Sequence, residues 1–294
     1  MKRLITICVL VAVYSNCLFA GTWTALNYPQ ARMTVPRGIS GNSVVGHRVD
    51  DLSGYGHGFL YNGTNWIGLD YPGAVETYPF SINGSKIVGY CAILYSYYGF
   101  IYDGTSWSRL QFPGAQNTYA YDIDGSKIVG SYNRYGGSHG FIYDGITWTT
   151  LDYPDSQYSN ICLSGISGSN IVGYYLANGK GYGLLYKNGT WTTLNYPGAI
   201  ETKPYSIDGN IIVGEYADNS GHHGFMYDGT SWTALNYPGA DYTGIQDISG
   251  LTLVGMYLPN GSGLFRGFIY TIPEPATLLL LGLGAAVLRK KARN

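Results

Sequence analysis

The stretch from residue 99 to 113 decides the fold: Gly99-Phe100-Ile101-Tyr102-Asp103-Gly104, then Thr105-Ser106, then Trp107-Ser108-Arg109-Leu110-Gln111-Phe112-Pro113. Two short aromatic runs joined through an Asp-Gly pair are typical of a β-hairpin with a type I′ turn. The same phrase recurs along the chain and is marked by the six tryptophans, 41 to 43 residues apart: Trp23, Trp66, Trp107, Trp148, Trp191 and Trp232. A self-similar period of this length indicates a propeller or another array of repeats.

Three further phrases keep the same period. Ile-x-Gly begins at Ile39, Ile82, Ile123, Ile166, Ile207 and Ile248. Val-Gly ends at Gly46, Gly89, Gly130, Gly173, Gly214 and Gly255. Gly-(Phe/Leu)-x-Tyr ends at Tyr61, Tyr102, Tyr143, Tyr186, Tyr227 and Tyr270. The four phrases therefore predict four short strands in each repeat unit. We expect the strand before Ile-x-Gly to line a channel and the Trp strand to be outermost.

The two ends of the repeat region complement each other. Residues 21–271 begin with a lone Trp strand and end with three strands that lack one. We therefore expect an all-β, six-bladed β-propeller of four-stranded blades, closed by the N-terminal strand pairing with the C-terminal blade. Such closure removes the open sheet edges. The alternative is an open β solenoid, whose end units would stay incomplete and uncapped.

Residues 1–20 have the pattern of a secretory signal peptide. The basic pair Lys2-Arg3 precedes an apolar run over residues 4–13, and Ala20 supplies a small residue at the cut. A transmembrane anchor needs about 20 apolar residues, which this run does not reach. Cys17 suits a lipoprotein site, but Asn16 before it is not the small residue that such a site prefers. We expect simple export.

The C-terminal segment, residues 272–294, has three parts in order. Pro273, Glu274 and Pro275 lead into an apolar run over residues 276–288, and a basic cluster follows over residues 289–293. Prolines end a preceding strand, and basic residues stay on the cytoplasmic side of a membrane. A run this short suits a transient inner-membrane anchor, a short hydrophobic helix, better than a permanent one.

This segment resembles the PEP-CTERM sorting tail of Gram-negative bacteria. The resemblance implies recognition and removal by an exosortase-type membrane protease, and a product at the cell surface or secreted, in species that often make extracellular polysaccharide. An ordinary tail anchor is the alternative.

The repeats also resemble the HAF family of extracellular repeats. His57-Gly58-Phe59, His139-Gly140-Phe141 and His223-Gly224-Phe225 match one part of its unit, and residues 82–89 match the other. The resemblance covers residues 21–271 and implies an extracellular location without a defined activity.

The charge of the body excludes some partners. Six of the 17 basic residues and one of the 18 acidic residues lie in the two end segments, which leaves 11 basic and 17 acidic residues, a net of −6. Nucleic acid and anionic polymers are therefore poor partners. Cys91 and Cys162 lie after the signal peptide, and the sequence leaves open whether they form a disulfide. No Cys/His spacing indicates a zinc site.

Three patterns that suggest chemistry have simpler explanations. His57, His139 and His223 occupy one repeat position, where each is expected to cap its own strand. The Gly-x-Ser-x-Gly at residues 136–140 lacks the helix that a nucleophile elbow needs. Asp70 and Asp152 lie on outer strands of different units, too far apart for a glycosidase pair. We expect no catalytic, cofactor-binding or metal-binding residues.

Tyrosines outside the repeat pattern are better candidates for a binding site. Tyr95, Tyr97, Tyr98 and Tyr135 lie in loops that vary between units, where a rigid scaffold usually presents its binding residues. Flat aromatic rings beside Asn and Ser suit sugar rings. We therefore expect a non-enzymatic surface or matrix protein that binds, or is associated with, an extracellular polysaccharide. The alternative is a secreted glycan lyase or hydrolase.

Intact-mass spectrometry of the native exported protein tests both ends. We expect a chain that starts near Gly21 and ends near Pro273–Pro275, because both end segments are signals for proteolytic removal. A native protein that still carries residues 276–293 would contradict removal of the tail.

Overall fold

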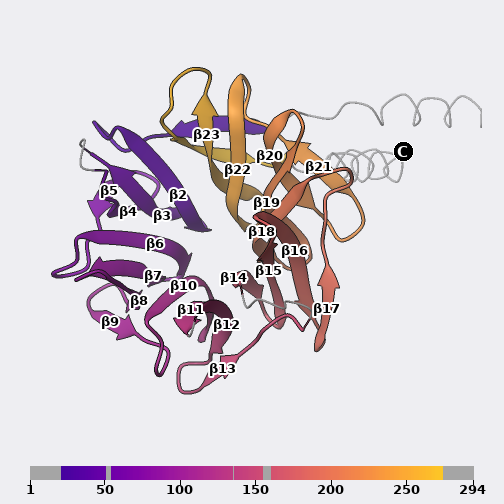
Figure 1. The fold of residues 1–294 in the computed structure, drawn as a ribbon. Helices are drawn as coiled ribbons and strands as arrows, with labels where there is room; N and C mark the ends of the chain where they lie inside the picture. Colours follow the sequence, from indigo (N-terminus) through magenta and orange to yellow (C-terminus); the bar gives the residue numbers. More distant parts are fainter. Residues whose placement is uncertain (1–20, 51–53, 135, 155–159, 274–294) are drawn as a thin grey trace, which may run out of the picture.

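The computed structural model describes residues 21–50, 54–134, 136–154 and 160–273. These residues form 24 strands and no helix. The strands make sheets that stand around a common axis, as the arms of a propeller do (Figure 1). The fold is therefore an all-β propeller.

Each repeat unit contributes one strand to each of four layers, from the axis outwards. The innermost strands are β2 (Met33–Ser40), β6 (Glu76–Asn83), β10 (Asn117–Asp124), β14 (Ile161–Ser167), β18 (Glu201–Asp208) and β22 (Ala240–Ser249). The second strands are β3 (Ser43–Val49), β7 (Lys86–Ile93), β11 (Lys127–Arg134), β15 (Asn170–Ala177), β19 (Ile211–Asp218) and β23 (Thr252–Pro259).

The two outer layers follow the same order. The third strands are β4 (His57–Tyr61), β8 (Ser96–Tyr102), β12 (Gly137–Tyr143), β16 (Lys180–Lys187), β20 (Gly221–Tyr227) and β24 (Arg266–Thr271). The outermost strands are β5 (Trp66–Gly68), β9 (Trp107–Leu110), β13 (Trp148–Thr150), β17 (Thr190–Thr193), β21 (Trp232–Leu235) and β1 (Thr22–Leu26). The Trp strands are thus outermost, as the sequence predicts.

The prediction of a six-bladed propeller of four-stranded blades is wrong. Four blades are separate four-stranded sheets, β2–β5, β6–β9, β10–β13 and β14–β17, while the other strands form one eight-stranded sheet. The last two repeat units share that sheet because β20 and β22 pair in parallel at His222 and Tyr242. The centroids of the His222 and Tyr242 side-chain rings lie 5.3 Å apart. The repeated phrases specify pairings inside a unit, and this pairing between units depends on residues outside them.

The N-terminal strand joins the C-terminal strands. β1 pairs antiparallel with β24, with Trp23 opposite Tyr270, and the indigo N-terminal strand accordingly lies beside the yellow C-terminal strands in Figure 1. This pairing agrees with the complementary ends of the repeat region. It ties the first residues of the repeat region to its last strand and covers the edge of β24.

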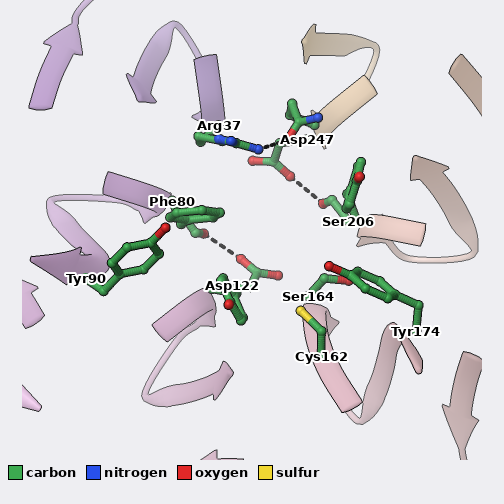
Figure 2. A pocket seen from close by; sticks show the side chains of 13 residues that line it. Arg37, Phe80, Tyr90, Asp122, Cys162, Ser164, Tyr174, Ser206 and Asp247 are labelled. Atoms are coloured by element: carbon green, nitrogen blue, oxygen red, sulfur yellow. Dashed lines mark hydrogen bonds between the residues drawn. The ribbon is translucent and has the colours of Figure 1, made fainter. Parts of the chain in front are cut away.

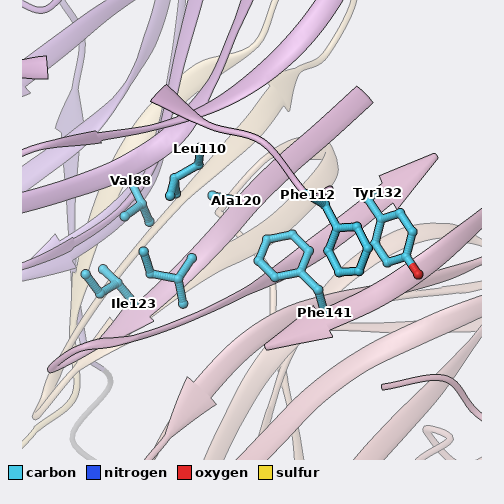
Figure 3. Close-up of a cluster of buried hydrophobic side chains, with 8 residues drawn as sticks. Val88, Leu110, Phe112, Ala120, Ile123, Tyr132 and Phe141 are labelled. Atoms are coloured by element: carbon cyan, nitrogen blue, oxygen red, sulfur yellow. The ribbon is translucent and has the colours of Figure 1, made fainter. Parts of the chain in front are cut away.

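Packing between neighbouring sheets forms the core. In the cluster of Figure 3, Val88 and Leu110 from the second unit belong to one buried group with side chains of the third, among them Phe141. Phe112 stacks on Tyr132 with ring centroids 3.7 Å apart. The equivalent phenylalanines of the Gly-Phe-x-Tyr phrase are fully buried: Phe59, Phe100, Phe141, Phe225 and Phe268. Burying each such side chain contributes about 1.5–3 kcal/mol, which explains why the phrase recurs.

A buried threonine near the start of five of the six inner strands fixes the chain that enters the strand. Thr118 Oγ1 accepts a hydrogen bond from the backbone N–H of Phe112 at 3.0 Å, and its side chain is completely buried. The same bond joins residues six apart in four other units: Thr34 with Tyr28, Thr77 with Tyr71, Thr202 with Tyr196 and Thr243 with Tyr237. The fourth unit has Ile161 at this position.

Thr118→Val tests this contact. The substitution keeps the shape of the side chain but leaves the Phe112 N–H buried without a partner, so we expect the free energy of unfolding to fall by about 1–3 kcal/mol. Urea unfolding measures it. Thr149→Val on the exposed face of β13 is the control and should change stability by less than about 0.5 kcal/mol. Equal effects of the two variants would disprove the role of Thr118.

Candidate functional site

A β-bulge interrupts every inner strand at the same place. In β10 the register moves from Ala120 directly to Asp122, so Tyr121 is the extra, unpaired residue. The bulge residues of the six units are Arg37, Phe80, Tyr121, Ser164, Tyr205 and Gln246. A bulge turns a side chain out of the alternating pattern of its strand. All six bulge residues line one cavity on the axis of the ring.

This channel cavity has a volume of about 220 Å³. Second-strand residues Tyr90 and Tyr174 complete its walls, and Figure 2 shows Phe80 and Tyr90 on one side with Tyr174 on the other. Arg37 is the basic residue among the described residues that line it. The lining thus combines aromatic rings, hydroxyl groups and one guanidinium group, the mixture that a site for a small polar ligand requires.

Two buried aspartates form the floor of the channel cavity. Asp122 accepts hydrogen bonds from the Ser81 hydroxyl at 2.5 Å, from the N–H of Ile166 at 2.6 Å and from the N–H of Ile123 at 2.8 Å. Ser81 and Ile166 belong to the units on either side. Asp122 therefore joins three consecutive units of the ring through one carboxyl group.

Asp247 repeats this arrangement on the other half of the ring. Its carboxyl group accepts hydrogen bonds from the Ser206 hydroxyl, from the N–H of Ile39 at 2.6 Å and from the N–H of Ile248 at 2.8 Å. Ile39 lies in the first unit and Asp247 in the last, so this contact also closes the ring. Figure 2 shows both carboxyl groups at the cavity, with Ser206 beside Asp247.

Glycine completes the pattern at the same strand position. Around the ring the residue before the repeated isoleucine reads Gly38, Ser81, Asp122, Gly165, Ser206, Asp247. A Cβ on Gly38 would lie 2.7 Å from the Cα of Ser81, and one on Gly165 would lie 2.8 Å from the Cα of Ser206. Each glycine therefore allows close approach of the next inner strand. The ring consists of two equivalent halves of three units.

The floor separates the channel cavity from a second one. The second cavity, of about 140 Å³, lies among the turns that follow the inner strands and shares Ser81, Asp122, Ser206 and Asp247 with the first. Hydrogen bonds from the next unit also hold these turns, because Gly168 N–H donates to Asp124 at 2.6 Å and Gly250 N–H donates to Asp208 at 2.7 Å. Asp122 and Asp247 thus lie between the two cavities and line both.

Burial decides the protonation of the two floor aspartates. Removal from water raises the pKa of the Asp122 carboxyl, and the hydrogen bonds from Ser81 and Ile166 oppose this effect only in part. Burial likewise raises the pKa of Asp247, and the charge of Asp122 raises it further. Both carboxyl groups therefore hold a proton more tightly in the folded chain than in the unfolded one.

A cluster of tyrosines adjoins the channel cavity through Tyr90 and Tyr121, which line it. Tyr97 from β8 lies 5.6 Å from Tyr119 of β10, and Tyr119 lies 5.0 Å from Tyr90 between ring centroids. Tyr78 packs on Tyr90 at 5.1 Å. Tyr119 and Tyr121 stack in parallel at 6.2 Å, which extends the cluster down to the bulge ring. Burial raises the pKa of Tyr90 to about 12, so its hydroxyl group stays neutral.

The predicted loop tyrosines divide between different surroundings. Tyr97 belongs to the tyrosine cluster beside the cavity, and its N–H donates to Asn117 Oδ1 at 2.9 Å. Tyr95 is fully exposed and has a positive φ of 69°. Tyr98 lies under the Arg109 guanidinium, 3.3 Å from its carbon to the ring centroid, and is not in the cluster. Tyr135 lies outside the described residues. Their role in binding stays a prediction.

The histidines and the outer aspartates pair with one another inside their own units. His139 Nδ1 lies 2.8 Å from Asp152, and His57 lies 3.4 Å from Asp70. The carboxylates also accept backbone N–H groups, as Asp152 does from Gly140 at 3.0 Å. These contacts fix the ends of strands within one unit, and the residues do not meet at the axis of the ring. Among the described residues no group of three His, Cys, Asp or Glu side chains can hold a metal ion.

The remaining candidates also have structural roles. Residues 137–143 form strand β12, so the Gly-x-Ser-x-Gly pattern has no helix after it. Cys91 and Cys162 are both free. Cys162 lines the channel cavity, where burial raises the pKa of its thiol to about 12 and keeps it in the weakly nucleophilic neutral form.

Sequence reasoning missed the bulge residues and the floor aspartates. Their signal is present in the repeat: two residues before each Ile-x-Gly the residue type changes in most units, from Arg37 through Tyr121 to Gln246, while the flanking positions are more uniform. Variation inside an otherwise regular strand marks the position that faces the axis. The alternation of Gly, Ser and Asp at the next position marks the contacts between units.

Comparisons with known proteins agree with the sorting tail and with the fold. Residues 271–292 match the family described as the PEP-CTERM protein-sorting motif. This motif indicates an exported, surface-directed protein. Pro273 is the last described residue, and Glu274 and Pro275 lie beyond it. The signal peptide over residues 1–20 and the apolar helix over residues 276–288 also lie outside the described residues and stay predictions. The described residues contain no helix with the length and apolar character of a membrane span.

Solved structures resemble the propeller at low sequence identity. The β-propeller domain of the trilobed protease from Pyrococcus furiosus has a TM-score of 0.54 and 10% identity, over 83% of this chain and 97% of that one. TolB from Acinetobacter baumannii has a TM-score of 0.56 and 14% identity, over 80% of this chain and 68% of that one. Acylaminoacyl peptidase from Pyrococcus horikoshii has 0.51 and 10%, over 88% of this chain and 56% of that one.

These structures support the fold alone. The chain spans 56% of the acylaminoacyl peptidase. No curated protein sequence matches the chain.

The raised pKa values of Asp122 and Asp247 predict how stability depends on pH. Their stabilising effect is complete below about pH 4, the ordinary pKa of an unfolded aspartate, and is lost as the pH rises through the raised folded values. We therefore expect the free energy of unfolding, from urea titrations, to decrease as the pH rises to 8 from about 6.5, the ordinary pKa of an unfolded histidine, above which the buried His47 is neutral in both states. The decrease should be smaller in Asp247→Asn.

Asp144→Asn is the control for this measurement. Asp144 accepts the N–H groups of Ile146 and Thr147, which lowers its pKa, so it is ionised in both states between pH 5 and pH 8. Its removal should leave the slope unchanged. A slope that is the same in the native protein and in Asp247→Asn would contradict the assignment.

Proposed function

We propose that this chain is an exported surface protein that binds a carbohydrate in its channel cavity and acts by binding, without catalysing a reaction. The sorting motif at residues 271–292 supports the location. The observation that carries the proposal is the continuous cluster of aromatic rings from Tyr97, through Tyr119, to Tyr90 and Tyr121, which line the cavity.

The chemistry of this cluster suits a sugar. Aromatic rings present apolar faces, and a tyrosine adds a hydroxyl group at the rim of the same surface. Ser164 and Gln246 supply further polar groups at the cavity wall. A pocket that combines apolar faces with a few fixed polar groups orients a small ligand that has both kinds of surface. Sugar rings have both.

The partners that we propose follow from the location that the sorting motif indicates. An exosortase-type protease would remove the tail in the membrane, and the released propeller would lie where an extracellular polysaccharide is deposited. The body has few charged side chains, with 12% charged residues in the whole chain, so uncharged contacts dominate the surface it offers. A matrix-associated or structural role agrees with such binding.

One observation favours a second candidate, a glycan hydrolase or lyase. Asp122 and Asp247 both line the channel cavity, and glycosidases use a pair of carboxyl groups. Each of the two carboxyl groups, however, accepts bonds from a serine and from two backbone N–H groups, as Asp122 does from Ser81 and Ile166. Groups used in this way hold the ring together, and we place binding first.

A glycan array with the purified protein tests the proposal. We expect binding to at least one bacterial polysaccharide, and a loss of about 1–2 kcal/mol in Tyr97→Ala, roughly five- to thirtyfold in affinity, since a favourable aromatic contact contributes on the order of 1 kcal/mol beyond the area it buries. Tyr95→Ala, which removes a fully exposed ring, should bind as the native protein does.

Two outcomes would contradict binding as the function. No binding to any glycan would exclude a carbohydrate ligand. Shortened glycan products, released by the native protein and absent with Asp247→Asn, would instead support the hydrolase or lyase.

A further inference from the structure

Arg37 is the charged residue among the six bulge residues. It comes from β2 in the first unit, and the other five bulge residues carry no charge: Phe80, Tyr121, Ser164, Tyr205 and Gln246. Among the described residues no ion pair includes Arg37. Its charge also acts on its surroundings, because it lowers the pKa of the buried His47 in addition to the larger effect of burial. The cavity therefore contains a cation without a fixed counter-ion.

The Arg37 guanidinium is held in place by uncharged neighbours. Nη1 donates to Gln246 Oε1 at 2.5 Å, and the guanidinium carbon lies 5.0 Å from the centroid of the Phe80 ring. Arg37 Nε and Gln246 Nε2 are buried donors without a hydrogen-bond partner in the described chain. A held guanidinium group with spare donors is suited to a planar anion, which it binds through two N–H groups.

The acids of the cavity do not neutralise Arg37. The carboxyl oxygens of Asp122 and Asp247 accept bonds from serine hydroxyl and backbone N–H groups of the ring, as Asp247 does from Ile39 at 2.6 Å. Burial raises the pKa of Asp247 to about 8, so this group stays mostly protonated at pH 7. Among the described residues neither Asp122 nor Asp247 forms an ion pair with Arg37. Tyr90 and Tyr174 are neutral at physiological pH. Burial raises the pKa of Tyr90, and the neighbouring Cys162 together with burial raises that of Tyr174.

We propose that the channel cavity recognises a carboxylate group on a sugar-sized ligand, a uronic acid, through Arg37 with Gln246 beside it. The inference rests on the proposed carbohydrate binding in the same cavity and names the class of sugar. The aromatic wall of Tyr90 and Tyr121 receives the ring of the sugar, and Arg37 receives its carboxylate.

The rest of the chain limits the size of this ligand. The body has a net charge of −6, so a long polyanion would be repelled from its outer surface. The volume of about 220 Å³ suits one small unit. One carboxylate in the channel cavity, on a free uronic acid or on the end of a chain, satisfies both limits.

Isothermal titration calorimetry of the purified full-length protein tests the proposal with three probes. Glucuronate is the charged monosaccharide, glucose is its neutral counterpart, and trigalacturonate represents a chain end. We expect glucuronate to bind about tenfold more tightly than glucose, because charge-assisted hydrogen bonds are roughly twice as strong as neutral ones. Arg37→Gln should abolish the preference for glucuronate, so that glucuronate and glucose bind this variant with equal affinity.

A matched control separates the site from a general effect of charge. Arg109→Gln makes the same change above Tyr98, outside the channel cavity, and should keep the preference for glucuronate. Thermal unfolding of each variant shows that it is folded. Binding of trigalacturonate as tight as that of glucuronate assigns the site to chain ends, and weaker binding assigns it to the free acid; both support recognition of the carboxylate.

Equal affinities for glucuronate and glucose would overturn the inference and leave the proposed carbohydrate binding intact. A preference for glucuronate that persists in Arg37→Gln would also overturn it. If neither monosaccharide nor trigalacturonate binds, and the glycan array is also empty, the proposed function fails together with the inference.

Discussion

Hydrogen bonds from neighbouring units to two buried carboxyl groups hold the centre of this propeller together. Asp122 and Asp247 each accept a serine hydroxyl from the preceding unit and a backbone N–H from the following one. A buried carboxyl group is costly unless its oxygens are bonded, so these contacts restrict how the inner strands can be placed. Gly38 and Gly165 allow the close approach that the bonds need. The two equivalent halves of the ring meet through the same contacts.

The β-bulges next to the floor aspartates place one side chain from each inner strand in the channel, and these side chains line the cavity. If each inner strand were regular, the residue before the floor position would continue the alternation of the strand. The bulge adds one residue, and the ring thereby directs six side chains toward the axis. Because these side chains make no ladder pairing, their identity is free to vary without disturbing the sheets. The cavity can therefore have aromatic groups on one side and Arg37 with Gln246 on another.

Most of the architecture could be predicted from the repeated phrases. The order of strands within a unit, the outermost Trp strands and the pairing of β1 with β24 follow from local turn chemistry and from the complementary ends of the repeat region. The number of separate blades did not follow, because the single pairing of His222 with Tyr242 joins two units into one eight-stranded sheet. For the site, the sequence predicted Tyr97 as a candidate and did not single out Tyr119 or Arg37.

The sequence by itself determined the repeat, the strand pattern and the sorting tail, because each depends on residues close together in the chain. Asp-Gly turns, the spacing of tryptophans and the order of Pro273, Glu274 and the basic cluster are local properties. Only the tertiary structure decided which residues meet at the axis. Arg37 and Gln246 are 209 residues apart in sequence, and they are in contact because closure of the ring places the first inner strand beside the last.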